Sequence, residues 1–292
     1  MPQPSLKRRL YRLYWNHLKP HRPWVQLPQG SVRFLPAEGA PTTDKAVKLY
    51  QIYFNEATKN KLSPVFTPYF NRNCTRYFEN DVLLDVYQNR TTEWEKADYV
   101  GVVSHKFYEK TNLLYKDVAR VVLEKPDNIP VISLLTYGKE QKVTDRLVEM
   151  GYPKGPAILQ EILVNHLGYP AEILKLQNLM IYRNFWLAPP AVFADYLENF
   201  LLPIRQVMEN ATGKLQELLL AKTETQIDYA RKGVDMEWVK ATFGRPHYTY
   251  HTYVLESCPA LYFAWKGIPV YYPFRKYRHL SGKQFRQAAS QG

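Results

Sequence analysis

Short runs of β-branched and aromatic residues alternate along this chain with segments of helical periodicity, and this alternation limits the folds open to it. The expected strands are residues 47–54, 99–103, 129–135, 179–187 and 268–272, and the expected helices between and after them are 77–87, 116–123, 157–166, 190–220 and 250–265. Strands that alternate with helices predict an α/β fold, a mixed sheet with helices on both faces.

Positive charge is concentrated at the two ends of the chain. Of the 39 Lys and Arg residues, seven lie in residues 1–37 and six in residues 257–292, and neither range contains an acidic residue. The chain between them has 26 basic and 27 acidic residues, so the net charge of +12 belongs to the ends. Basic ends of this kind are typical of proteins that contact a polyanion, such as nucleic acid, anionic lipid or a charged glycan.

The two ends differ in pattern. Residues 6–18 carry leucines at near-helical spacing with Arg8, Arg9 and Arg12 between them, which predicts a short basic amphipathic helix. That helix would dock on the core, contact nucleic acid or rest on a membrane surface. In the last segment Arg275, Lys276 and Arg278 alternate with aromatic rings, so that cations can reach phosphates while rings stack on bases.

Proline spacing and charge together divide the chain into three parts. Five prolines between residues 20 and 44 predict an extended connector after the first helix. We therefore expect a basic helix and connector over 1–44, the α/β domain over 45–272 and a basic tail over 273–292. No apolar run approaches the roughly 20 residues that cross a bilayer, and the two cysteines cannot form a disulfide framework. These features predict a cytoplasmic protein.

Polar residues follow three of the expected strands. They are Tyr53, Asn55 and Glu56 after the first strand, Ser104, His105 and Lys106 after the second, with Lys110 one turn later, and residues 137–139 after the third. Ligands of open α/β sheets gather beyond the carboxyl ends of the strands. Such groups can hold the diphosphate of a nucleotide sugar, and they would serve a nucleotide-binding enzyme of another class equally well.

A carboxylate on an apolar helix is a second candidate. Glu256 lies in the expected helix 250–265 between apolar neighbours, where burying a charge is costly unless the charge is paired or takes part in function. We consider two roles for it, a catalytic carboxylate and a member of a structural ion pair. His251 lies five residues earlier, near the same face of the helix.

Four segments carry a resemblance to a known family. They are 49–56 (LYQIYFNE), 98–111 (DYVGVVSHKFYEKT), 178–188 (NLMIYRNFWLA) and 251–263 (HTYVLESCPALYF). Their order resembles a bacterial and phage family of glycosyltransferases with the GT-A, Rossmann-like fold, including enzymes of polysaccharide loci. The likeness covers about residues 47–270. It implies that Tyr53, Asn55, Glu56, Ser104, His105, Lys106 and Lys110 bind a nucleotide-sugar donor such as a UDP-sugar, that Asn184 contacts the acceptor, and that Glu256 and His251 are catalytic.

The sequence departs from that family at the metal motif. GT-A enzymes usually hold a divalent ion through Asp-x-Asp after a central strand, and this chain has no such motif. The nearest approximations are Glu93-Trp-Glu95 and Asp235-Met-Glu237, and neither follows a clear strand. The cofactor is therefore left open: either Mg²⁺ or Mn²⁺ is held differently, or His105, Lys106 and Lys110 neutralise the phosphates without a metal.

The predicted function is transfer of a sugar from a nucleotide-sugar donor. Because the ends are basic and aromatic, DNA ranks first as acceptor partner, with the hydroxyl of a hydroxymethylated base as nucleophile and the basic residues of both ends on the phosphate backbone. A surface or capsular polysaccharide transferase, at a membrane surface with a glycan acceptor, is the first alternative. A nucleic-acid-binding protein without catalysis is the second.

Overall fold

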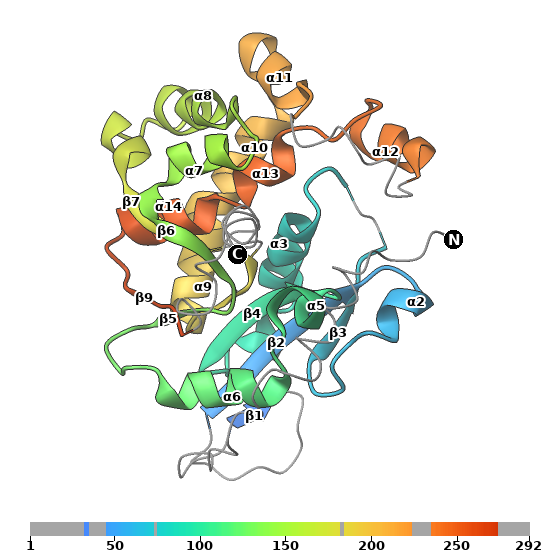
Figure 1. The fold of residues 1–292 in the computed structure, drawn as a ribbon, viewed down its shortest axis with the longest axis vertical. Helices are drawn as coiled ribbons and strands as arrows, with labels where there is room; N and C mark the ends of the chain where they lie inside the picture. The colour runs from blue at the N-terminus through green and yellow to red at the C-terminus, as the bar shows by residue number, and fades with distance from the viewer. Residues whose placement is uncertain (1–31, 35–44, 73–74, 182–183, 224–234, 274–292) are drawn as a thin grey trace, which may run out of the picture.

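Strand β2 (Lys45–Tyr53) is the centre of the main sheet in the computed structural model, which describes residues 32–34, 45–72, 75–181, 184–223 and 235–273 (Figure 1). On one side β2 pairs in parallel with β4 (Tyr99–Ser104). On the other side it pairs in parallel with β1 (Val32–Phe34) near its start and with β3 (Thr67–Phe70) near its end. All of β4 and nearly all of β2 are buried, as is usual for parallel strands covered on both faces.

Strand β8 (Trp186–Leu187) extends the sheet beyond β4. An antiparallel bridge joins Val100 to Ala188 through two backbone hydrogen bonds of 2.8 and 3.0 Å. β8 also pairs antiparallel with β5 (Val131–Ser133), which pairs in parallel with β9 (Val270–Tyr271). The strands thus follow one another as β3, β2, β4, β8, β5 and β9. Separately, β6 (Thr136–Lys142) and β7 (Gln177–Ile181) form an antiparallel pair.

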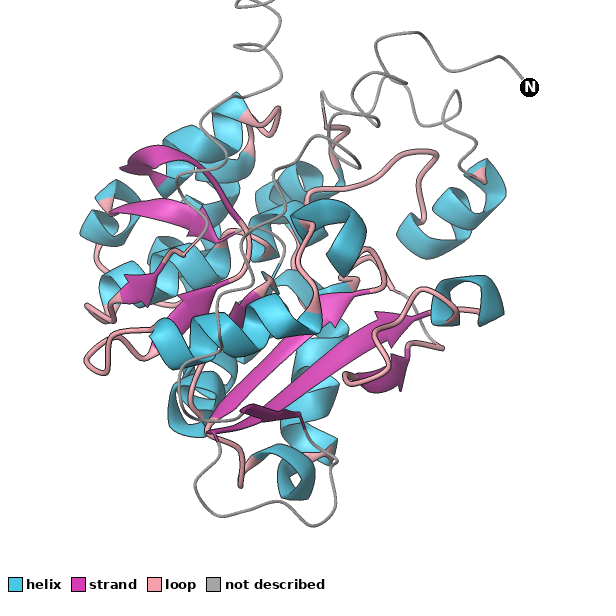
Figure 2. Ribbon diagram, turned by 60° about the horizontal axis from the view of Figure 1, so that its bottom comes forward, coloured by secondary structure: helices cyan, strands magenta, loops and turns pink. Residues whose placement is uncertain are grey.

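Helices cover both faces of the sheet, which confirms the predicted α/β class (Figure 2). Side chains alternate along β2, so Tyr50 and Ile52 belong to one core and Val47 and Leu49 to the other. The larger core includes residues of α3 (Glu79–Asn89), α9 (Pro190–Tyr196), α10 (Leu202–Glu209), α13 (His251–Leu255) and α14 (Cys258–Trp265); the smaller includes α6 (Tyr115–Glu124) and Phe107 of α5 (Phe107–Thr111).

The other helices are short. They are α2 (Glu56–Lys59), α4 (Thr91–Trp94), α7 (Val143–Glu149), α8 (Gly155–Leu159) with a π-helical continuation (Gln160–His166), a 3-10 turn (Ala171–Lys175), a π-helical link (Leu197–Leu201) between α9 and α10, α11 (Gly213–Leu220) and α12 (Met236–Phe243). Within the described ranges, no helix is long and apolar enough to cross a membrane.

Several expected elements differ from the observed ones. The expected strand 179–187 is two strands, β7 and β8, in different sheets, because the chain turns at Asn184 with a left-handed φ of 61°. The expected helix 190–220 is interrupted after Glu209, and α11 begins at Gly213, whose φ is 52°. Residues 137–139 lie inside β6 and not at a strand end, so the third predicted strand-end site is wrong.

The described structure begins earlier in the sequence than the expected α/β domain. Val32–Phe34, expected in the connector, forms β1 and pairs with the start of β2. The predicted polyanion-binding residues lie outside the described part of the chain: Arg8, Arg9, Arg12, Arg275, Lys276 and Arg278.

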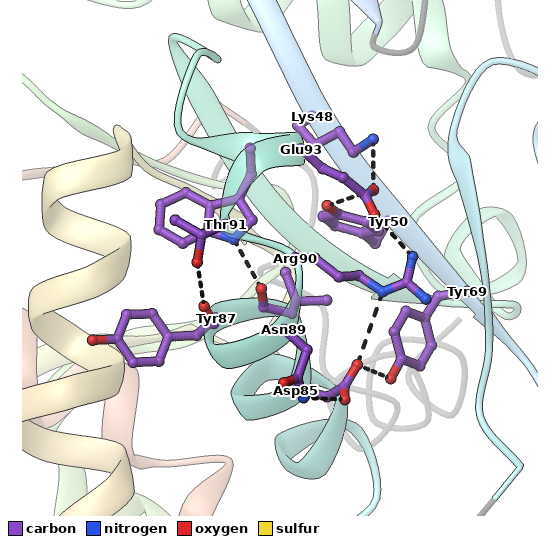
Figure 3. Close-up of polar contacts among 11 residues, drawn as sticks. Lys48, Tyr50, Tyr69, Asp85, Tyr87, Asn89, Arg90, Thr91 and Glu93 are labelled. Carbon is purple, nitrogen blue, oxygen red and sulfur yellow. Dashed lines mark hydrogen bonds and ion pairs between the residues drawn. The ribbon is translucent and has the colours of Figure 1, made fainter.

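A charged network attaches α3 and α4 to the sheet (Figure 3). Lys48 on β2 is 4% exposed, and its Nζ lies 3.1 Å from Glu93 Oε2. The Tyr50 hydroxyl donates to the same oxygen at 3.1 Å, and Arg90 donates to Glu93 Oε1 at 3.1 Å. Burial raises the pKa of Glu93, but Lys48, Tyr50 and Arg90 together outweigh it, so the pKa is lowered below 4.5.

Removing the Glu93 carboxylate is expected to destabilise the fold. Glu93→Ala leaves the buried Lys48 ammonium without its anion, and we expect a loss of about 2 kcal/mol in urea unfolding at pH 7, below the range for fully buried pairs because water reaches Glu93. A depressed carboxyl pKa stabilises the fold above pH 4.5, and this contribution disappears as pH falls through the folded-state pKa. The variant and the parent should therefore converge in acid. Glu95→Ala, at an exposed position, is the control, and equal losses for the two variants would contradict the assignment.

Candidate functional site

The carboxyl ends of β2 and β4 lie side by side, because Ile52 pairs with Ser104. The residues that follow, 53–56 and 104–110, therefore share one edge of the sheet, which we call the carboxyl edge. Figure 1 shows α2, α5 and the start of α3 around this end of the sheet. The two predicted strand-end groups are thus brought together by the parallel pairing of their strands.

The residues after β2 have clear local contacts. Asn55 begins α2, and its side-chain oxygen accepts from the Thr58 N–H at 2.9 Å, while the Thr58 hydroxyl accepts from the Asn55 N–H. Glu56 is exposed and lies 3.3 Å from Lys59. Tyr53 stacks on the Phe70 ring, with centroids 5.1 Å apart. A donor-binding role for Tyr53, Asn55 and Glu56 stays a prediction.

The last residue of β4 and the residue after it each carry a buried polar atom with no hydrogen-bond partner among the described residues. These are Ser104 Oγ and His105 Nδ1, and Ser104 is only 3% exposed. The His105 ring packs edge-on against Phe54 at 5.4 Å. Burial, followed by the charges of Lys106, Lys61 and Lys110, lowers the pKa of His105 to about 4. His105 is therefore neutral at pH 7 and can exchange hydrogen bonds with a ligand without supplying charge.

Lysines surround His105, and one of them is uncompensated. Lys61 is paired with Glu109 at 3.0 Å, and the Lys110 ammonium lies over the Phe185 ring at 5.2 Å. Lys106 is exposed, and no described carboxylate lies within 4.0 Å of it. Its charge is therefore available to an anionic ligand at the carboxyl edge.

Asn184 connects the carboxyl edge to the start of α3. It is 1% exposed, and its amide donates to Asn80 Oδ1 at 3.1 Å. The Asn80 amide in turn donates to the Tyr77 carbonyl at 3.0 Å. Phe185, the next residue, packs against Phe107 with ring centroids 5.7 Å apart, so Asn184 lies near the residues that follow β4. Asn184 Oδ1 is a third buried polar atom without a described partner. Its burial disfavours contact with a large acceptor and suits an inner wall of the site.

His251 lies on the other side of Tyr77. Its ring packs edge-on against Tyr77 at 5.3 Å, and its Nδ1 is hydrogen-bonded to the Thr249 hydroxyl at 2.8 Å. Burial, with the charges of Arg76 and Arg205, lowers the pKa of His251 to about 3. His251 is thus neutral at pH 7, and the residue as a whole is 2% exposed.

Two arginines flank Tyr77. Arg205 lies over its ring, with the guanidinium carbon 3.3 Å from the centroid, and pairs with Asp81 at 3.0 Å and with Glu209. Arg76 lies 5.6 Å from the same ring and forms no ion pair within the part of the chain that the structure describes. The Tyr77 hydroxyl is buried without a described partner.

Glu256 ends α13 and is 8% exposed. Its N–H donates to the Thr252 carbonyl at 2.9 Å, and the Thr252 hydroxyl donates to the Tyr77 carbonyl at 3.4 Å. The backbone of Glu256 is therefore one helical turn from the residues around Tyr77. The catalytic role and the structural ion pair both stay predictions for this carboxylate.

Among the residues that the structure describes, the carboxyl edge offers no metal-binding donor set. In the described residues, no three His, Cys, Asp or Glu side chains gather where they could hold an ion. The approximations to the metal motif have other roles: Glu93 binds Lys48, and Asp235 caps α12 by accepting from the N–H groups of Glu237 and Trp238 at 2.9 and 3.2 Å. The residues after β4 are Ser, His and Lys, of which only the imidazole is a common metal ligand.

The site includes residues that the sequence patterns did not single out. Arg76, Tyr77 and Asn80 reach it from the start of α3, through contacts with residues more than 100 positions away. The available signal was the pair of arginines, Arg72 and Arg76, before the two aromatic residues that precede α3.

Comparison with known proteins gave one similar solved structure. No protein-family model matches this chain, and no curated protein matches its sequence. The apo structure of the bifunctional glycosyltransferase WbbM is similar with a TM-score of 0.41 and 13% identity, over 77% of this chain and 44% of that one. This chain therefore spans less than half the length of that protein, and similarity at this level does not assign an activity.

Proposed function

We propose that the protein is a glycosyltransferase that binds the diphosphate of a nucleotide-sugar donor at the carboxyl edge. The observation that supports this is the pair of buried, unpartnered polar atoms, Ser104 Oγ and His105 Nδ1, beside the uncompensated Lys106 at the end of a central parallel strand. A buried polar atom left unpaired costs about 1–3 kcal/mol. Phosphate oxygens would satisfy both atoms, and a cation beside them favours an anionic ligand.

The remaining residues fit roles around such a donor. The stacked pair of Tyr53 and Phe70 offers an aromatic face at the ends of β2 and β3, suited to a nucleobase. In the reaction, an acceptor hydroxyl attacks the anomeric carbon of the sugar, the nucleoside diphosphate leaves, and the hydroxyl proton passes to a base. Glu256 is our candidate for that base, and His251 lies nearby with its ring packed against Tyr77.

The acceptor assignment rests on the basic ends of the chain. A hydroxymethylated base in DNA stays our first candidate, because arginines and rings alternate in residues 271–279. A glycan acceptor at a membrane surface is the alternative. Binding of nucleic acid without catalysis is the third candidate, and it predicts no donor site at all.

A thermal-shift screen of nucleotide sugars tests the proposal. One nucleotide class should raise the melting temperature in a concentration-dependent way, because a ligand specific to the folded state stabilises it by about 2.7 kcal/mol at 100 times its Kd. Ser104→Ala is the companion variant. It removes an unpaired buried hydroxyl, so we expect equal or higher stability without ligand but a smaller ligand-induced shift. Stabilisation by duplex DNA alone, with none by any nucleotide sugar, would favour the non-catalytic candidate.

A further inference from the structure

The leaving group of the proposed reaction needs positive charge beside it. When the acceptor oxygen bonds to the anomeric carbon, the bond from that carbon to the phosphate oxygen breaks, and its electron pair stays on the diphosphate. The acceptor proton passes to the base. The nucleoside diphosphate therefore leaves with one more negative charge than it carried in the donor, and a metal ion or a fixed cation placed there stabilises the transition state.

Three acidic side chains near the carboxyl edge are already engaged in ion pairs. Glu56 is paired with Lys59 and Glu109 with Lys61. At the start of α3, Asp81 binds Arg205 and accepts from the Thr75 hydroxyl. A divalent ion in such a site is held by several oxygen ligands, commonly carboxylates. These three acids pair with side-chain cations, and no three described His, Cys, Asp or Glu side chains gather where they could hold an ion.

Side-chain cations supply the missing charge. Lys106 has no described carboxylate within 4.0 Å and is close enough to His105 to lower its pKa. Arg76 forms no described ion pair either and acts on the pKa of His251 in the same way. Their neighbours Lys61 and Arg205 are both neutralised by acids. Lys106 and Arg76 are thus two cations of this region that form no described ion pair.

A continuous chain of contacts links these two cations. Lys106 is followed by Phe107, whose ring packs against Phe185 with centroids 5.7 Å apart, and Phe185 follows Asn184. Asn184 binds Asn80, Asn80 binds the Tyr77 carbonyl, and Arg76 lies over the Tyr77 ring. The unpartnered atoms Ser104 Oγ, His105 Nδ1 and Asn184 Oδ1 lie along this chain. Oxygens of a diphosphate accept hydrogen bonds from a hydroxyl or a neutral imidazole.

We propose that Lys106 and Arg76, and not a divalent metal ion, neutralise the leaving diphosphate at the carboxyl edge. This inference rests on the proposed function. Ser104 and neutral His105 provide hydrogen bonds to the phosphate oxygens, and the two cations provide the charge. An arginine and a lysine placed in this way stabilise a leaving phosphate by the same electrostatic means as a metal ion.

Calorimetric titration of UDP into the full-length protein tests the inference. We expect the same affinity in EDTA as in excess Mg²⁺ or Mn²⁺. Lys106→Met and Arg76→Met should each weaken binding in EDTA by about 10- to 100-fold, the range for loss of a charge-assisted contact. Lys45→Met is the matched control, since Lys45 is exposed at the opposite, amino end of β2, and it should bind UDP like the parent.

The outcomes separate this inference from the proposed function. Binding of UDP only when Mg²⁺ or Mn²⁺ is present would overturn the metal-free site and leave the glycosyltransferase proposal standing. Equal UDP affinities for Lys106→Met, Arg76→Met and Lys45→Met, with unchanged melting temperatures, would overturn the assignment of Lys106 and Arg76 as the phosphate-binding cations. If UDP, ADP, GDP, CDP and dTDP all fail to bind with and without metal, the proposed function fails, and the inference fails with it.

Discussion

Glu256→Gln is expected to lower turnover by about two to four powers of ten while leaving donor affinity unchanged. The substitution keeps the shape of the side chain but removes its ability to accept the acceptor proton. Glu256 is suited to this role because it is 8% exposed, at the end of a helix whose preceding turn contacts Tyr77. Initial rates at saturating donor, with calorimetry for donor binding, provide the measurement.

The control for Glu256 must distinguish catalysis from folding. Glu172→Gln changes a carboxylate that is 68% exposed and lies 3.7 Å from Lys175, so turnover should stay at the parental level. Melting temperature should be recorded for both variants. A Glu256→Gln protein that melts early but turns over normally at low temperature would show that Glu256 belongs to a structural ion pair and that the base is another residue.

Gly101→Ala is expected to destabilise the protein by about 3–5 kcal/mol. A Cβ at this position would lie 2.5 Å from the Trp186 carbonyl oxygen and 2.7 Å from Leu187 Cδ2. The first of these atoms is backbone and cannot rotate away. β4 and β8 would have to separate, which strains the core and weakens the two hydrogen bonds between Val100 and Ala188. Urea unfolding measures the loss.

A second glycine provides the comparison for Gly101. Gly244 ends α12 with a φ of 64°, and a Cβ there would meet no atom within 4 Å. Gly244→Ala should therefore cost only the left-handed backbone penalty of roughly 1–2 kcal/mol. If both variants lose the same stability, the close approach of β4 and β8 is not the constraint that we infer. Because β8 continues from Asn184, we also expect Gly101→Ala to weaken UDP binding.

The strand ends at the carboxyl edge could be predicted because they depend on the apolar and polar pattern of a few neighbouring residues. The apolar runs at 47–54 and 99–103 correspond to β2 and β4, and the polar residues after them can be recognised in the sequence. Asp98 stands directly before the second of these runs, and its carboxylate accepts from the Ala46 N–H at 2.7 Å. The absence of an Asp-x-Asp motif was likewise visible in the sequence.

The contacts between distant segments could not be predicted in this way. The run 179–187 is apolar or aromatic apart from Arg183 and Asn184 and was predicted as one strand, but it is divided between two sheets, with a left-handed φ at Asn184. Asparagine tolerates this conformation, but its presence does not require it. The roles of Arg76 and Tyr77 depend on where α3 and α13 pack, which no local pattern encodes.

The sequence by itself therefore determined the α/β class, the two central strands and the polar groups that end them. Hydrophobic periodicity and turn residues act over a few neighbours, so they specify elements and their ends. The tertiary structure alone decided that β8 runs antiparallel beside β4 and that Asn184, Tyr77 and Arg76 reach the carboxyl edge. It also decided which cations there form ion pairs and which do not. Those outcomes depend on packing between residues far apart in the chain, because the pairing of strands and helices is determined by the core as a whole.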